Sequence, residues 1–106
     1  MLKIGGIYKE VNAFDKMERY FIVLKKINEM IYGYDIDIYQ ELISQKQVLS
    51  ELKKQSPLFL QDFWTASEKT VEDIVDGYLG KVEYEMFDLL IRYLYQSDVW
   101  NEEEDW

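Results

Sequence analysis

Arg19 is the residue whose type and setting best fit catalysis. A guanidinium fixed on a strand can brace two oxygens at once, which would stabilise negative charge that develops on oxygen atoms in a transition state. The 106 residues include no His and no Cys, so Ser-His-Asp triads, Cys-His pairs and His/Cys zinc sites are excluded. The alternative for Arg19 is a surface residue whose stem covers apolar side chains while its head stays in solvent.

Asp35 and Asp37 could hold a divalent cation. They flank Ile36, so a strand would point both carboxylates to one side, with about 7 Å between their Cα atoms. Hard cations such as Mg²⁺ prefer carboxylate ligands. No third carboxylate and no glycine-bearing calcium loop accompanies the pair, which favours the solvated face of a half-buried sheet. We therefore predict neither a metal nor a cofactor.

Negative charge is concentrated in the second half of the chain. The net charge is −9, yet residues 1–61 carry 8 acidic and 9 basic side chains, whereas residues 62–106 carry 13 acidic side chains against Lys69, Lys81 and Arg92. Phosphate backbones are bound by Lys and Arg, so we do not expect the acidic half to bind nucleic acid directly. Its field would instead attract basic surfaces, including the nucleic-acid-binding clefts of other proteins.

These acidic residues and two tryptophans are the predicted partner-binding site. Glu72 and Asp76 would share one helical face at about 6 Å, close to the phosphate spacing of a nucleic-acid strand. Trp100 and Trp106 border the last acidic run, and Trp is a preferred interface anchor. The predicted set is Glu68, Glu72, Asp73, Asp76, Glu83, Glu85, Asp88, Trp100, Glu102, Glu103, Glu104, Asp105 and Trp106. We expect them to gather at one end of the molecule. The alternative role of the carboxylates is ordinary solubility.

Three strand-like segments open the chain and would position Arg19. They span residues 4–11, 18–27 and 30–39, and they are rich in β-branched and aromatic residues. Gly5-Gly6 fits a bend, residues 12–16 read as a turn, and Asn28-Glu29 form a tight reversal. Three short antiparallel strands in succession predict a meander, the start of a small barrel.

Helical signals dominate the rest of the chain. Ser44-Gln45-Lys46-Gln47 fits a capping box, so a middle helix is expected to run to Lys53-Lys54 before Ser56-Pro57. The apolar segment 58–64 predicts a buried strand. Residues 83–96 place apolar side chains at helical spacing, which predicts a core-facing last helix with an Asp88–Arg92 pair on its outer side.

A second, weaker capping signature begins at Thr70. It predicts a short helix that Gly77 ends, followed by a strand over residues 78–82. The alternative is one longer helix that runs to Leu79 and stops at Gly80. In either case the acidic pair Glu72 and Asp76 would lie near this helix.

The order of these elements resembles the PemK/MazF family of toxin endoribonucleases, which have an SH3-like barrel with added helices. Gly6-Ile7-Tyr8, the strand from Arg19 to Leu24 and Leu79-Gly80-Lys81-Val82 are similar to family motifs. The resemblance implies an α+β fold, a small antiparallel SH3-like barrel with a middle helix and a C-terminal helix. It also implies a catalytic role for Arg19. Tyr20 stands where the family has Pro, and the third strand lacks the family's Thr or Ser.

Together these features predict a non-enzymatic acidic binding protein. We expect one domain over residues 1–97 and an acidic, mobile tail over residues 98–106. The function would be to occupy a basic nucleic-acid-binding surface of a partner, as phage and mobile-element inhibitors of nucleases do, anti-CRISPR proteins included. The alternative is a divergent endoribonuclease of a toxin–antitoxin system. The absence of Cys and of any long apolar run predicts a cytoplasmic protein without membrane contact.

Overall fold

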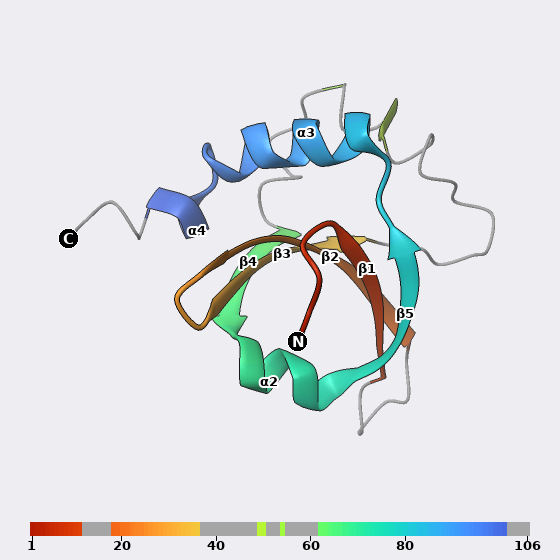
Figure 1. The fold of residues 1–106 in the computed structure, drawn as a ribbon. Helices are drawn as coiled ribbons and strands as arrows, with labels where there is room; N and C mark the ends of the chain where they lie inside the picture. The colour runs from red at the N-terminus through yellow and green to blue at the C-terminus, as the bar shows by residue number, and fades with distance from the viewer. Residues whose placement is uncertain (12–17, 37–48, 51–53, 55–61, 102–106) are drawn as a thin grey trace.

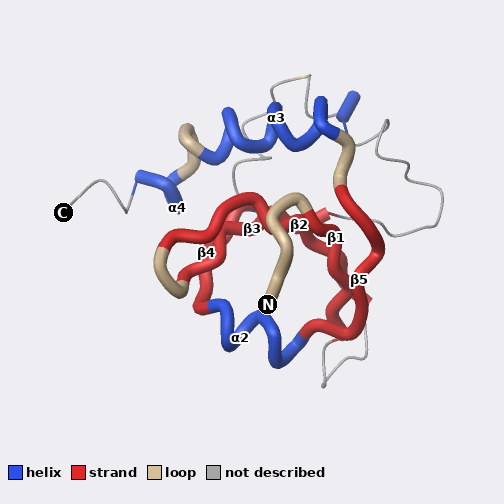
Figure 2. Tube along the Cα trace, viewed as in Figure 1, coloured by secondary structure: helices blue, strands red, loops and turns tan. Residues whose placement is uncertain are grey.

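The computed structural model describes residues 1–11, 18–36, 49–50, 54 and 62–101 (Figure 1). Their elements, in chain order, are β1 (Gly6–Val11), β2 (Glu18–Ile27), β3 (Met30–Ile36), β4 (Phe63–Ser67), α2 (Glu68–Ile74), β5 (Val75–Lys81), α3 (Tyr84–Leu94) and α4 (Asp98–Asn101). The five strands form one antiparallel sheet, and Figure 2 shows the short helices on both sides of it. The predicted α+β class is therefore confirmed.

The predicted meander forms the centre of the sheet. β2 pairs with β1 on one side and with β3 on the other. The β2–β3 reversal uses Asn28, whose φ of 57° lies in the left-handed region that Asn tolerates. Gly5, with a φ of 81°, makes the bend before β1 that the glycine pair predicted.

The sheet curls into a barrel that hydrogen bonds do not close. Its strand order is β4-β3-β2-β1-β5, so β4 and β5 are the two end strands. α2 runs directly from the end of β4 to the start of β5, and Figure 1 shows the strands and this helix around a ring. The described residues therefore form an open, barrel-like sheet whose gap is spanned by α2.

β5 departs twice from regular pairing with β1. The paired residues are Ile7–Gly80, Tyr8–Tyr78, Lys9–Gly77 and Glu10–Val75. Asp76 and Leu79 are consequently extra residues that face no partner of their own in β1. Such bulges bend a strand and aim the extra side chain away from the regular ladder.

The two faces of the sheet carry separate apolar cores. Strand alternation sends Ile22 to one face, against the buried Leu90 of α3, and Phe21 to the other face, near the buried Val71 of α2. Leu2 is buried on the α2 side as well. α2 and α3 are therefore held on opposite sides of one sheet.

The structure corrects both predicted ends of the helix that contains Glu72. The helix does not begin at Thr70, because the Ser67 hydroxyl caps it and accepts a hydrogen bond from the Thr70 amide at 3.2 Å. It does not end at Gly77 either, since Val75 is already extended and begins β5. The longer helix to Leu79 is excluded for the same reason. A strand after this helix is confirmed, with the bounds Val75–Lys81.

The predicted strand over residues 58–64 is confirmed for Phe63 and Trp64, which begin β4. β4 begins at Phe63 and continues to Ser67, because it pairs with β3 from Tyr34–Phe63 to Met30–Ser67. Residues 55–61 lie outside the described part. So do the turn over residues 12–16, residues 37–39 of the third strand and most of the middle helix, of which only Leu49, Ser50 and Lys54 are described.

The predicted last helix is confirmed as α3. Glu83 precedes its first turn, and Met86, Leu90 and Leu94 form its buried stripe. The expected Asp88–Arg92 ion pair is present at 3.0 Å. No helix in the described ranges is long and apolar enough to span a bilayer.

Candidate functional site

The described acidic residues of the predicted site form two groups on opposite sides of the sheet, not one acidic end. Glu68, Glu72, Asp73 and Asp76 belong to α2 and the start of β5, whereas Glu83, Glu85 and Asp88 belong to α3 and its N-terminus. In Figure 1, α2 and α3 lie below and above the strands. α2 packs on one face of the sheet and α3 on the other, so the described carboxylates do not form one acidic end.

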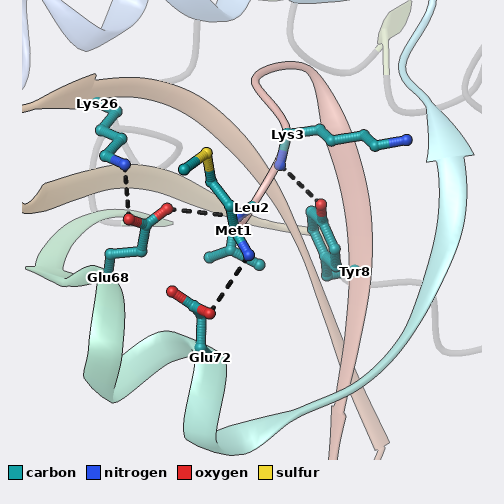
Figure 3. A network of polar contacts seen from close by, with 7 residues as sticks. All are labelled: Met1, Leu2, Lys3, Tyr8, Lys26, Glu68 and Glu72. Carbon is teal, nitrogen blue, oxygen red and sulfur yellow. Dashed lines mark hydrogen bonds and ion pairs between the residues drawn. The ribbon is translucent and has the colours of Figure 1, made fainter.

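Glu68 is committed to contacts within the protein. Its carboxylate accepts from the Lys26 ammonium at 2.6 Å and from the Leu2 amide at 3.3 Å, as Figure 3 shows. The hydrogen bond from Lys26 lowers the pKa of the Glu68 carboxyl below its ordinary value. With its side chain only 14% exposed, Glu68 holds the first residues against α2 and presents little charge to a partner.

Two further contacts of the first residues lie beside that of Glu68. Glu72 contacts the Met1 nitrogen at 3.4 Å, and the Lys3 amide donates to the Tyr8 hydroxyl at 2.7 Å (Figure 3). Both partners of the Glu72 contact are exposed, so it adds little to stability. The Glu72 carboxylate therefore stays at the surface.

Asp73 and Asp76 complete the group on the α2 side. Both are exposed. Asp76 reaches Lys9 only at 3.8 Å, whereas Glu18 takes the closer position at 3.0 Å. The Glu18 hydrogen bond raises the pKa of Lys9, and the same bond lowers the pKa of Glu18. Lys9 is thus engaged mainly by Glu18, and the Asp76 carboxylate remains solvent-facing.

The α3 group has a structural explanation of its own. Glu83 and Glu85 lie at the helix N-terminus, where carboxylates interact favourably with the helix dipole. Asp88 is paired with Arg92. These contacts give the acidic residues of the α3 group a role within the fold.

Trp100 packs on the body of the protein. Its ring lies 5.6 Å from that of Tyr32 and 4.5 Å from that of Tyr95, and the Lys25 ammonium sits 4.7 Å from its centre. Ser97, which is buried, caps the short helix α4 by accepting from the Trp100 amide at 3.3 Å. The first four residues of the predicted tail therefore form α4. Glu102, Glu103, Glu104, Asp105 and Trp106 lie outside the described residues.

Arg19 lies on β2 among carboxylates. Glu10 faces it directly across the β1–β2 pair, and the charge of Arg19 acts on the Asp35 carboxyl. Asp35 accepts a hydrogen bond from the Trp64 indole at 2.7 Å. Burial beside that ring raises the pKa of Asp35; the indole bond opposes the rise and Glu10 adds to it. Sequence patterns did not predict Trp64 or Glu10 here, because pairing between separate strands places Glu10 opposite Arg19 and Trp64 beside Asp35.

The predicted pair Asp35 and Asp37 cannot be assessed as a pair, since Asp37 lies outside the described residues. Among the residues that the structure does describe, no three Asp, Glu, His or Cys side chains are grouped so as to hold a metal.

Comparison with known proteins adds no identification: no family model, no curated protein and no solved structure matches this chain. The resemblance to the PemK/MazF family therefore stays a prediction.

Proposed function

We propose that this chain is a non-enzymatic acidic binding protein that occupies a basic, nucleic-acid-binding surface of a partner protein in the cytoplasm. The observation that carries the proposal is the display of its charge. From residue 69 to residue 100 every acidic side chain is exposed or half-exposed, and only Lys69, Lys81 and Arg92 balance them. Such a surface repels phosphates and attracts the Lys and Arg side chains that bind them.

The α2 side supports this function better than the α3 side. Asp73 and Asp76 are exposed, and the contact of Asp76 with Lys9 is long, at 3.8 Å, whereas Asp88 is paired with Arg92 at 3.0 Å. A carboxylate whose internal ion pair is long loses less when it enters a basic groove, because only a weak contact has to be broken.

The test uses purified nucleases and RNA-guided DNA-cleaving complexes as a panel. We expect the full chain to inhibit cleavage by at least one member, to compete with its nucleic acid, and to lose affinity steeply as salt rises. Asp73→Asn with Asp76→Asn should weaken inhibition. The matched control, Glu85→Gln with Asp88→Asn, removes the same charge from the other side of the sheet and should not. Failure to inhibit or bind any member would overturn the proposal.

A second candidate function rests on Arg19 and Asp35. Asp35 is a carboxylate of raised pKa on the strand next to Arg19, which supplies the acid–base partner that a ribonuclease would need. Expression in bacteria separates the two functions. Growth arrest with RNA cleavage, both abolished by Arg19→Ala and by Asp35→Asn, would favour the ribonuclease. No arrest and no cleavage would leave the binding protein.

A further inference from the structure

The conformation of α2 depends on contacts outside the helix. α2 has seven residues, of which only Val71 is buried. Helices this short are not stable on their own in water, because the first turn is costly to form. α2 also carries Glu72 and Asp73 and leads directly into β5, where Asp76 is the second residue. The contacts that hold α2 therefore also set the positions of the exposed carboxylates on this side of the sheet.

The first residues of the chain, Met1–Ile4, hereafter the strap, supply much of that support. Figure 1 places the N-terminus within the ring that the strands and α2 form. Leu2 is buried in the same apolar cluster as Val71. Its amide donates to the Glu68 carboxylate at 3.3 Å, and that carboxylate also accepts from Lys26 at 2.6 Å (Figure 3). The first residue of α2 thus connects the helix to both the strap and β2.

Gly5 and Gly6 turn the chain so that the strap lies beside β1. Gly5 has a φ of 81°, in the left-handed region that favours glycine. A β-carbon at Gly6 would stand 2.8 Å from the Tyr8 ring. The Gly6 amide donates to the Lys3 carbonyl at 3.0 Å, and the Lys3 amide donates to the Tyr8 hydroxyl at 2.7 Å. Specific contacts therefore fix the position of the strap.

The strap and the carboxylates of α2 are linked through the body of the helix. If the strap leaves, Glu68 loses the Leu2 amide, and Val71 loses a member of its apolar cluster. α2 then has fewer outside contacts, and its carboxylates are no longer held in fixed places. A partner that contacts them in their observed positions binds the docked form more tightly. Such a difference in affinity couples the two sites reciprocally.

We propose that the strap positions the carboxylates of α2 for a basic partner, so that docking of Leu2 and binding of the partner favour each other. This inference rests on the proposed function and names what controls its site. Leu2 and Glu68 are positioning residues, because they act on the partner through α2.

The test measures amide exchange in α2 and the affinity of the full chain for an oligo-arginine peptide, which stands in for a basic surface. Leu2→Ser removes the buried side chain and keeps every charge. We expect exchange in α2 to become faster relative to α3, and the affinity to fall about fivefold, the lower end of couplings between sites. Leu2→Met conserves the volume and should restore both. Ile4→Ser, at an exposed residue of the strap, is the matched control and should change neither.

Two further measurements separate positioning from a general loss of stability. In a chain that already carries Asp73→Asn and Asp76→Asn, the change Leu2→Ser should no longer lower the affinity, because the carboxylates that it positions are gone. Saturating peptide should slow amide exchange at Lys3 and Gly5 in the wild type, because the coupling is reciprocal.

Lys26→Met separates positioning from net charge and decides the inference if Leu2→Ser does not fold. The variant is more negative than the wild type, so electrostatic attraction alone predicts tighter binding of the peptide. The strap predicts weaker binding, since the Glu68 carboxylate loses the ammonium that holds it at 2.6 Å.

Three results would overturn the inference: wild-type affinity in Leu2→Ser, faster exchange in α2 without loss of affinity, or tighter binding by Lys26→Met. In each case the proposed function stands if the nuclease panel is still inhibited. Conversely, coupling between the strap and the peptide with no nuclease affected would retain the strap as a positioning element and reject the proposed function.

Discussion

The Trp64 indole packs against Gly33, its direct neighbour across the β3–β4 pair. A β-carbon at position 33 would stand 2.7 and 2.8 Å from two ring carbons of Trp64. The glycine thus leaves the room in which the indole reaches Asp35 with a hydrogen bond of 2.7 Å. Because residue 33 has no side chain, the Trp64 indole can approach and bind the Asp35 carboxylate, two residues further along β3.

Gly33→Ala is accordingly expected to destabilise the protein by about 1–3 kcal/mol, since overpacking forces the ring or the strand to move. Chemical denaturation measures the loss, and the blue-shifted part of the tryptophan emission should change with it. Gly77→Ala is the matched control: a β-carbon there meets nothing within 4 Å, so its effect should be far smaller. Equal losses in the two variants would contradict the role of the indole.

Asp35→Asn should stabilise the folded protein at neutral pH. The folded-state pKa of Asp35 is raised, mainly by burial, so its ionised form costs stability above that pKa. The cost disappears as the pH falls below the unfolded value, where the carboxyl is protonated in both states. Asn can still accept from the Trp64 indole. Unfolding free energies measured from neutral to acidic pH should therefore show an advantage of the variant that shrinks toward low pH.

Glu68→Gln should change the stability at neutral pH in the opposite direction to Asp35→Asn. The pKa of Glu68 is lowered by the hydrogen bond from Lys26, so its contribution to stability is present above the ordinary value and is lost as the pH falls through the folded-state pKa. The variant is expected to be less stable than wild type at neutral pH, and the difference should narrow in acid. Glu72→Gln, at the more exposed contact, serves as the control and should change little.

Lys25→Met should loosen α4 without unfolding the sheet. The Lys25 ammonium lies over the rings of Tyr95 and Trp100 and donates to the Tyr95 hydroxyl at 2.6 Å. Each cation–π contact at a partly exposed site is worth about 0.5–1 kcal/mol. Amide exchange in Asp98–Asn101 should become faster relative to α3, whereas Lys25→Arg keeps the cation and the protection. Unchanged exchange in the Met variant would show that Trp100 is held by packing alone.

Local sequence patterns predicted those helices and strands whose conformation depends mainly on their own side chains. The bounds of β2 follow from its run of β-branched and aromatic residues, and the buried stripe of α3 follows from its spacing. The predicted start of α2 was wrong, because Ser67 and Thr70 are both residue types that cap helices. The choice between them depends on a distant contact, the Glu68 amide donating to the Glu29 carbonyl at 2.8 Å.

The candidate site was less predictable for a similar reason. A sequence shows which residues are acidic, but not on which side of a sheet each helix packs. Alternation along β2 supplies apolar residues to both faces, so it is compatible with either placement of α2 and α3. The bulges at Asp76 and Leu79 leave no periodic signal, and the nearness of Arg19, Glu10 and Asp35 results from pairing between separate strands.

The irregular outer edge of β5 also bears on how this protein behaves at high concentration. Fibres that grow by pairing the edge strand of one sheet with the edge strand of the next need a regular strand at each edge. With Asp76 and Leu79 displaced from the ladder, β5 offers a poor template for such growth. A chain this rich in Tyr and in apolar strands can thus leave Tyr78 and Leu79 exposed without offering a regular edge for sheet growth.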